Sequence, residues 1–322
     1  MLKTPNFWIK KNIISYALLP LSLIYFVGFF LLKIFSKKRK ISKSVICVGT
    51  LIAGGSGKTP TAIALGKILQ EMSVDFAFLS RGYMNDGSKF LMLKKSDQNK
   101  ASQVGDEPLL LSEIATTFVA KDRFFGATQI EAMKDFQVIL LDDGMQNNSL
   151  QLDLTILVID GNLGFGNGFL LPAGPMREPI CSGLKKADLV IVIGEMKQDL
   201  QKKLVGKKIV GAKIIPLNLG KFYGRKLIAF CGLAYPEKFF SFLRKNDLQI
   251  LETHEFRDHH PYIDVELETL FCAAQEQGAE LITTKKDWVK FSPSFQKKIS
   301  YLDIDLKFDD EKTITEELRK IL

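Results

Sequence analysis

Hydrophobic residues beyond position 44 gather into short runs that are separated by longer segments of mixed polarity. The runs are rich in Val, Ile and Leu, and the segments between them have helical patterns of apolar positions. This alternation predicts an α/β fold in which helices cover both faces of a mostly parallel sheet. The predicted strands cover residues 45–48, 74–79, 138–141, 155–159 and 189–193, and the predicted helices cover residues 58–71 and 108–115.

A second α/β pattern begins near residue 226 and is separate from the first. It consists of a short apolar strand, a helix and a further strand, at residues 227–230, 236–244 and 280–283. We therefore expect an N-terminal segment over residues 1–43, a larger α/β domain over residues 44–220 and a smaller α/β domain over residues 221–322.

The N-terminal segment contains 20 consecutive uncharged residues, at positions 13–32. A helix of that length is about 30 Å long, which matches the hydrocarbon thickness of a bilayer. The run ends at Lys33 and a basic cluster instead of the small residues of a signal peptide cleavage site, so we expect a retained membrane helix. Pro20 and Gly28 interrupt the run. They leave open a helix that lies in the membrane interface, and a hairpin packed on the protein is a third alternative.

The positive charge of the chain is confined to its N-terminal end. Nine of the 44 bases lie in residues 1–43, where there is no acid, and this leaves 35 bases against 36 acids in the remainder. Such a distribution disfavours a nucleic-acid partner and favours anionic headgroups beside the anchor. The larger basic cluster follows the apolar run, so the positive-inside rule places the bulk of the chain in the cytoplasm.

The four cysteines, Cys47, Cys181, Cys231 and Cys272, are widely spaced along the chain. They form no C-x-x-C pair, and most of them lie in apolar runs. We therefore expect reduced structural thiols in a cytoplasmic compartment rather than disulfides or a metal site.

The clearest local signal is the sequence GGSGKT at residues 54–59, between a predicted strand and a predicted helix. A phosphate-binding loop requires that context. Its glycines let backbone N–H groups face the phosphates, Lys58 reaches the β- and γ-phosphate oxygens, and the hydroxyl of Thr59 can ligate Mg²⁺. The loop departs from the usual G-x-x-x-x-G-K-[ST] spacing because Ile52 occupies the place of the first glycine. The expected nucleotide contacts are Gly54, Gly55, Ser56, Gly57, Lys58, Thr59 and Pro60.

Two carboxylates, Asp142 and Asp143, end a predicted strand of the same sheet. In this kind of fold the end of that strand lies near the phosphate loop, where one or both carboxylates can hold Mg²⁺. A pair of strand-end aspartates that only form a turn is the structural alternative.

Two further groups of polar residues are candidates for chemistry. In the sequence VGDEP at residues 104–108, the local pattern alone favours Asp106 as a helix N-cap, with Glu107 compensating the helix dipole. The adjacent His259 and His260 lie in a polar loop, and no further Cys or His completes a metal site. Acid–base catalysis, a phosphate contact and a surface pair without a role therefore remain open for them.

The ordered set of motifs in this chain resembles the tetraacyldisaccharide 4'-kinase family of lipid A biosynthesis. After the apolar N-terminal helix it contains GGSGKTP at 54–60, SRGY at 80–83, VGDEP at 104–108, DDG at 142–144, GNG at 166–168, LPAGPMREP at 171–179 and DHH at 258–260. The resemblance implies a P-loop kinase that transfers the γ-phosphate of ATP to the 4'-hydroxyl of an acylated glucosamine disaccharide 1-phosphate, with Mg²⁺ as cofactor. It also implies a place at the cytoplasmic face of a bacterial inner membrane. We expect a monomer, although the sequence leaves the oligomeric state open.

The resemblance also implies roles for single residues. In that family the acid of the VGDEP motif is the catalytic base and the first His of the DHH motif assists it, which replaces the cap interpretation of Asp106. The expected catalytic residues are then Asp106, His259 and Lys58, the expected Mg²⁺ ligands are Thr59 with Asp142 or Asp143, and the expected substrate contacts are Tyr83, Asn85, Asn147, Arg177 and Glu178.

One motif departs from the pattern of that family, which usually reads DDGFQH. This chain has Met145 in place of the Phe and Asn147 in place of the His. An asparagine forms hydrogen bonds but does not titrate, so a substrate contact stays possible at this position while a protonation role is in doubt.

A membrane-associated GTPase or ATPase switch that acts on a protein partner is the alternative function. The sequence TKKD at residues 284–287 supports it, because it follows a strand and is similar to the guanine-binding signature T-K-x-D. A membrane scaffold with an inactive nucleotide fold is a further alternative, which the intact Lys58, Thr59 and Asp106 disfavour.

Overall fold

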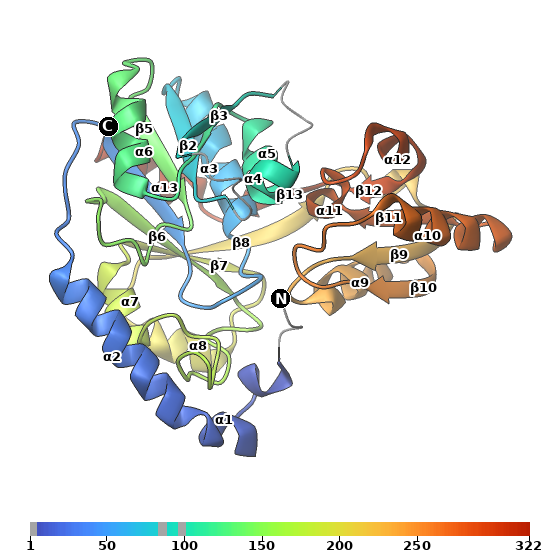
Figure 1. Cartoon of the computed structure of the whole chain (residues 1–322), viewed down its shortest axis with the longest axis horizontal. Coiled ribbons are helices and arrows are strands. Elements are labelled where there is room, and N and C mark those ends of the chain that lie inside the picture. Colours follow the sequence, from blue (N-terminus) through green and yellow to red (C-terminus); the bar gives the residue numbers. More distant parts are fainter. Residues whose placement is uncertain (1–4, 83–88, 96–100) are drawn as a thin grey trace.

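The computed structural model describes residues 5–82, 89–95 and 101–322, and it contains two β-sheets (Figure 1). The larger sheet has the strand order β13-β8-β7-β6-β1-β5-β2-β4-β3. Its strands are β1 Ser44–Gly49, β2 Phe76–Ser80, β3 Leu91–Leu93, β4 Thr117–Val119, β5 Val138–Asp142, β6 Leu154–Asp160, β7 Leu189–Ile193, β8 Ile209–Pro216 and β13 Ile304–Phe308. All pairs are parallel except those of the edge strands β3 and β13. The predicted mostly parallel α/β sheet is therefore confirmed.

Both faces of this sheet are covered by helices, which explains why its central strands are apolar at every position. On β5, Val138 and Leu140 point to one face, and Ile139 and Leu141 point to the other. The first face is covered by α3 Lys58–Glu71, α5 Asp106–Ser112 and α13 Glu311–Arg319. The second is covered by α6 Arg123–Ala132, α7 Ile180–Lys186 and α8 Gln198–Lys203. The short helix α4 Ala101–Val104 precedes α5.

The smaller sheet forms a second unit, which we define as residues 226–302. Its four parallel strands have the order β10-β9-β11-β12. The strands are β9 Lys226–Cys231, β10 Gln249–Glu255, β11 Glu280–Thr284 and β12 Ser300–Leu302. The helices are α9 Pro236–Lys245, α10 Asp264–Glu276, α11 Lys285–Trp288 and α12 Pro293–Lys298, and a short helix η2 Leu219–Lys221 precedes the unit.

The last 19 residues, 304–322, return to the larger sheet. Strand β13 pairs with β8, and Ile314 and Leu318 of α13 are fully buried in the core of the larger unit. The expected C-terminal domain at residues 221–322 thus includes a strand and a helix that belong to the larger unit, because the apolar side chains of these elements complete its core.

The N-terminal segment folds as η1 Asn6–Trp8, α1 Ile13–Ala17 and α2 Leu19–Phe35 instead of one continuous helix. The break falls just before Pro20, because a proline ring clashes with the preceding helical turn. In the part of the chain that the structure describes, no helix is long and apolar enough to cross a membrane. The predicted spanning helix is therefore corrected to two shorter helices along the outside of the larger unit (Figure 1).

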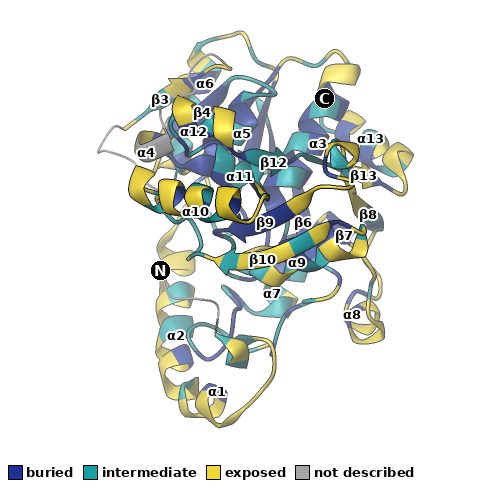
Figure 2. Ribbon diagram, turned by 90° about the vertical axis from the view of Figure 1, so that its right-hand side faces the viewer, coloured by how far each residue is buried: buried dark blue, intermediate teal, exposed yellow. Residues whose placement is uncertain are grey.

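One face of this helix pair is attached to the Gly- and Pro-rich loop at residues 161–179. Tyr25 Oη of α2 donates to the carbonyl of Arg177 at 2.9 Å, and Trp8 Nε1 of the preceding η1 donates to the carbonyl of Pro172 at 3.0 Å. Ser22 Oγ donates to Leu170 at 2.8 Å. The other face of α1 and α2 is exposed along most of its length (Figure 2).

Candidate active site

The phosphate loop predicted at residues 54–59 lies between the end of β1 and the start of α3. Gly57 has a φ of +88°, a conformation that a residue with a side chain rarely adopts. A Cβ atom on Gly55 would lie 2.9 Å from Cδ2 of Tyr235, because the second unit packs directly on the loop. Lys58 begins α3 and is only 8% exposed. The loop thus combines a helix N-terminus with a largely buried ammonium group, an arrangement that binds phosphate.

Asp142 lies beside this loop, because it ends β5 and is paired in register with Val48 of β1. Its Oδ2 accepts a hydrogen bond from Thr59 Oγ1 at 3.2 Å, and its Oδ1 is buried with no hydrogen-bond partner among the described residues. Burial, helped by the negative charge of Glu107, raises the pKa of Asp142 to about 7. An unpartnered carboxylate oxygen beside a hydroxyl fits a Mg²⁺ site, which in kinases needs only one or two protein ligands in addition to phosphate.

Asp143 has cationic partners instead. Nη1 of Arg177 donates to both oxygens of Asp143, at 2.9 and 2.8 Å, and Nζ of Lys58 lies 3.8 Å from Oδ2. Burial alone would raise the pKa of Asp143, but the charges of Lys58 and Arg177 lower it. Of the two carboxylates, Asp142 is therefore better placed to bind a cation, while Asp143 holds Lys58 and Arg177 together.

Asp106 and His259 meet although they come from different units. Asp106 is the first residue of α5, and His259 lies in the loop between β10 and α10, where it has a φ of +57°. Nδ1 of His259 lies 3.0 and 2.9 Å from the two carboxylate oxygens of Asp106. The N-cap position of α5 belongs to Gly105, so Asp106 is not the cap that its local sequence favours.

Asp106 is 2% exposed, yet its surroundings favour the ionised form. Burial alone would raise the pKa of Asp106. The charge of Lys286, the hydrogen bond with His259 and the charge of Lys290 together hold it well below its usual range. The carboxylate is therefore ionised at neutral pH and accepts hydrogen bonds only.

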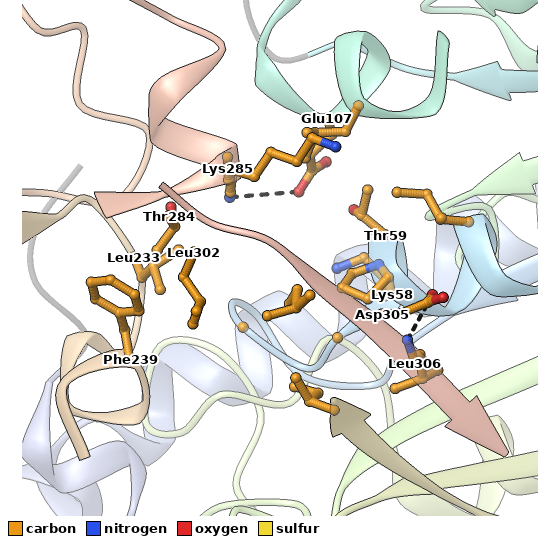
Figure 3. Close-up of a pocket in the computed structure, with 18 of the residues that line it drawn as sticks. Lys58, Thr59, Glu107, Leu233, Phe239, Thr284, Lys285, Leu302, Asp305 and Leu306 are labelled. Atoms are coloured by element: carbon orange, nitrogen blue, oxygen red, sulfur yellow. Dashed lines mark hydrogen bonds and ion pairs between the residues drawn. The ribbon is translucent and has the colours of Figure 1, made fainter. Parts of the chain in front are cut away.

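A cavity of about 390 Å³ lies between the two units, beside these groups. The phosphate loop and Glu107 line it from the larger unit, and Asp258 and Lys286 line it from the second unit. Figure 3 shows Lys58 and Thr59 on one side of the cavity and Leu233 and Phe239 on the other. Its apolar part suits a purine ring, because small-molecule sites are mostly apolar with a few well-placed polar groups.

Comparison with known proteins identifies this arrangement. The family model described as "Tetraacyldisaccharide-1-P 4'-kinase" matches residues 14–322. The chain belongs to this family. It is 37% identical to the tetraacyldisaccharide 4'-kinase of Paramagnetospirillum magneticum, over 98% of this chain and 97% of that protein. It is also 37% identical to the tetraacyldisaccharide 4'-kinase of Jannaschia sp., over 100% of this chain and 99% of that protein.

A solved structure has the same fold. It is the crystal structure of the "apo" form of LpxK from Aquifex aeolicus in complex with ATP. The two structures superpose with a TM-score of 0.76 at 26% identity, and the match covers 96% of this chain and 99% of that chain. The fold therefore agrees with that of a family member over nearly the whole chain.

Membership of the 4'-kinase family sets aside the guanine-binding interpretation of residues 284–287. Within this TKKD sequence, Thr284 caps α11, and the Oγ1 of Thr284 donates to Asp287 at 2.8 Å. Asp287 is fully buried and accepts hydrogen bonds from the backbone N–H of Gly232 at 2.9 Å and from Lys290 at 2.7 Å. The carboxylate that would recognise guanine is thus occupied within the second unit.

The substrate contacts that the sequence predicts in the family kinase lie in different surroundings. Tyr83 and Asn85 lie outside the described residues. Arg177 faces the catalytic end of the sheet through its pair with Asp143. Oδ1 of Asn147 accepts hydrogen bonds from the residues that follow it, Ser149 and Leu150, so it stabilises a turn.

Glu178 is fully buried, and both of its carboxylate oxygens have partners within the chain. Oε2 lies 2.7 Å from Nζ of Lys186 and accepts a hydrogen bond from Ser182, and Oε1 accepts one from Gln146 at 3.1 Å. These contacts connect α7 to the loop that carries Arg177. In the described structure Glu178 therefore supports that loop rather than facing the cavity.

Replacing Glu178 by alanine is expected to lower the free energy of unfolding by about 3 kcal/mol, because Lys186 and Gln146 lose their partner. Chemical denaturation measures this change. Glu280→Ala is the control, since it removes an ion pair with Arg225 in which both side chains are about half exposed, and it should cost less than about 1 kcal/mol. Equal losses in the two variants would contradict a supporting role for Glu178.

The sequence reasoning did not assign Lys286 and Lys290 to the site. Nζ of Lys290 lies 3.8 Å from Asp106 Oδ2, and Nζ of Lys286 lies 3.3 Å from Nε2 of His259. Lys286 lies within the TKKD sequence of the second unit, and Lys290 follows it three residues later. The similarity of TKKD to a guanine-binding signature favours a nucleotide contact for this segment instead of a contact with Asp106. The signal that could have identified Lys286 and Lys290 is the presence of a basic segment in one unit and an acidic motif in the other.

Proposed function

We propose that this chain transfers the γ-phosphate of ATP to the 4'-hydroxyl of tetraacyldisaccharide 1-phosphate, as its family name indicates. The observation that carries the proposal is the contact of Asp106 with His259, whose chain neighbours Glu107 and Asp258 line the same cavity as the phosphate loop. The loop and a hydroxyl-activating carboxylate are the two parts that phosphoryl transfer to an alcohol requires. All the groups named come from one chain, which supports a monomer as the active form.

Different residues of the chain bind the phosphates and activate the attacking hydroxyl. Backbone N–H groups of the phosphate loop and the ammonium group of Lys58 bind the phosphates of ATP. Arg177, aligned by Asp143, adds a planar cation at the same end of the sheet. Asp106 accepts the hydrogen bond of the attacking hydroxyl and then its proton, and His259 orients Asp106.

We assign the Mg²⁺ site to Thr59 and Asp142, because Oδ1 of Asp142 is a buried carboxylate oxygen without a hydrogen-bond partner among the described residues. When bound there, Mg²⁺ would neutralise negative charge on the β- and γ-phosphate oxygens. Asp143 is assigned a positioning role through Lys58 and Arg177.

The activities of variants at Asp142 and Asp143 are expected to depend on Mg²⁺ in different ways. Asp142→Asn is expected to raise the Mg²⁺ concentration for half-maximal activity about tenfold or more, because it removes a negatively charged ligand oxygen. Asp143→Asn should lower the rate with little change in that concentration. A titration of activity with Mg²⁺ at saturating ATP measures both variants. The opposite result would exchange the roles of the two carboxylates.

We further propose that α1 and α2 lie in the membrane interface, at the cytoplasmic face of the bacterial inner membrane. Their outer face exposes large apolar side chains, among them Ile24, Leu32 and Phe35 at 68%, 70% and 82%. A basic cluster follows at residues 33–43 and suits anionic headgroups. The inner face contacts the loop of Arg177, so the lipid surface and the phosphate site are connected by one loop.

The double variant Ile24→Asp/Leu32→Asp is expected to weaken binding to anionic vesicles about 100-fold, because each lost apolar contact contributes about 1.5 kcal/mol or more. Flotation with vesicles of phosphatidylglycerol and phosphatidylethanolamine measures the bound fraction. Val205→Asp/Val265→Asp makes the same change at residues 82% and 73% exposed outside the helix pair, and it should leave binding unchanged. Equal binding of the two double variants would argue against the interfacial helices.

The transfer itself is tested with detergent-solubilised protein, Mg-ATP and tetraacyldisaccharide 1-phosphate. Mass spectrometry should detect a lipid product heavier by one phosphoryl group. Hydrolysis of ATP without a phosphorylated lipid would contradict the proposed function.

A further inference from the structure

Lys286 is placed at the far side of the imidazole ring that contacts Asp106. Its Nζ lies 3.3 Å from Nε2 of His259, 3.5 Å from Oδ1 of Asp258 and 3.7 Å from Oε1 of Glu107. The side chain is one-fifth exposed, at 20%. The ammonium group of Lys286, on α11 of the second unit, therefore lies close to one imidazole and two carboxylates of the reaction site.

The helix that carries Lys286 is held firmly at its other face. Thr284 caps α11, and the fully buried Asp287 accepts hydrogen bonds from Gly232 and Lys290. These contacts leave little freedom for the backbone of Lys286. The position of the ammonium group relative to His259 is thus set by the fold of the second unit.

The two nitrogen atoms of His259 have different partners, and these partners define where the proton lies. Nδ1 faces both oxygens of Asp106, and an ionised carboxylate accepts hydrogen bonds only, so Nδ1 carries a hydrogen. Nε2 faces the ammonium group of Lys286, which donates only, so Nε2 offers its lone pair. The arrangement is complete when the imidazole is neutral and protonated at Nδ1.

Lys286 remains charged in these surroundings. Burial alone would lower the pKa of Lys286, but the negative charges of Asp106, Glu107 and Asp258 raise it well above its usual range. It therefore remains a hydrogen-bond donor at neutral pH, and Nε2 of His259 faces it as the acceptor.

We infer that Lys286 is a positioning residue that holds His259 as the Nδ1–H tautomer, so that Nδ1–H donates to Asp106 and orients this carboxylate for the attacking hydroxyl. The inference rests on the proposed function for its catalytic meaning. It adds to the reaction a residue that acts on Asp106 through His259.

The charged groups around His259 define what the loss of Lys286 would do. Asp106 contacts Nδ1, and Asp258 Oδ1 lies 3.8 Å from Nε2. Lys290 contacts Asp106 from the second unit, and Glu107 faces Lys286 from α5. Without Lys286 two carboxylates face the ring and Nε2 has lost the ammonium donor, so the contact that keeps Nε2 an acceptor is removed.

The tautomer is measured directly by ¹⁵N NMR of the full-length protein labelled at histidine. The signal is assigned with His259→Gln, because the chain has three histidines. In the wild type at pH 7.5 we expect the hydrogen on Nδ1 and a lone pair on Nε2, and in Lys286→Met we expect a hydrogen on Nε2. A wild-type ring protonated at Nε2, or an unchanged ring in Lys286→Met, would overturn the inference.

Lys285→Met is the matched control, since it removes the same charge from the neighbouring position of α11. Nζ of Lys285 pairs with Glu113 at 2.7 Å and with Asp303 at 3.5 Å. We expect its loss to leave the tautomer of His259 unchanged. A change of tautomer in this control as large as that in Lys286→Met would show a general charge effect and would overturn the specific role of Lys286.

The pH profile of phosphoryl transfer provides a second readout that a merely structural residue would not change. In Lys286→Met the acidic limb of kcat/KM should move to higher pH by about one unit or more, whereas Lys286→Arg should keep the limb near its wild-type position. An unmoved limb in Lys286→Met would overturn the inference. The NMR measurement needs no substrate, so a failed lipid kinase assay with the expected tautomer would count against the proposed function alone.

Discussion

Asp106→Asn is expected to lower the rate of phosphoryl transfer about 10³-fold, within the range that general-base catalysis usually contributes. The amide has nearly the shape of the carboxylate but does not accept a proton from the attacking hydroxyl. It also removes a negative charge that Lys286, Lys290 and His259 surround. The rate is measured with tetraacyldisaccharide 1-phosphate at saturating ATP, and the affinity for ATP should change little.

Asp122→Asn separates this effect from helix capping. Asp122 is the exposed N-cap of α6, and its Oδ1 accepts hydrogen bonds from Phe124 and Phe125 at 2.9 and 3.1 Å. Its replacement by another capping residue should leave activity unchanged. If Asp106→Asn retained more than about a tenth of the activity, Asp106 would not be the base.

The pH dependence follows from the same contacts. The pKa of Asp106 is lower in the folded protein than in the unfolded chain, so its contribution to stability is present at neutral pH. That contribution is lost only as the pH falls through the lowered value. The carboxylate is thus not expected to titrate near neutral pH.

Lys58→Met is expected to lower the rate of transfer about 10²- to 10³-fold, because it removes one preorganised charge from the phosphates while it keeps most of the side-chain volume. It should also raise the KM for ATP, since the ammonium group binds the ground state as well. Steady-state kinetics with varied ATP measures both effects.

Lys312→Met is the control for this substitution. Lys312 is exposed on α13 of the larger unit, so the same change there should leave the kinetics unaffected. A Lys58→Met protein with normal kinetics would show that the loop does not bind the transferred phosphate.

Features that the sequence predicts well are those encoded within a short segment. The strand at residues 138–141 is apolar at each position, because it is buried on both faces, and the structure has it as β5 Val138–Asp142. The phosphate loop carries its own glycines, lysine and threonine, so its place between β1 and α3 also follows from the sequence.

Features that depend on contacts between distant segments were not predictable in this way. The run at residues 13–32 has the length of a membrane span, but Pro20 divides it and the loop near Arg177 binds one face. The family resemblance implies a substrate contact for Glu178, and only the fold shows its contacts with Lys186 and Gln146. The catalytic role of Asp106 follows from the family resemblance alone, because the local sequence favours a helix N-cap at this position.

The return of β13 to the larger sheet has a mechanical consequence. The chain enters the second unit after β8 and leaves it before β13, and these two strands are antiparallel neighbours. The two connections are also bonded to each other, since the backbone N–H of Leu217 donates to Asp303 and Asn218 donates to Tyr301, both at 2.9 Å. A body attached by two adjacent connections rotates about one axis more readily than about the others. The distance from Asp106 to His259 is therefore expected to change mainly with the angle between the two units. Mutations at residues 217–218 should alter turnover through this angle.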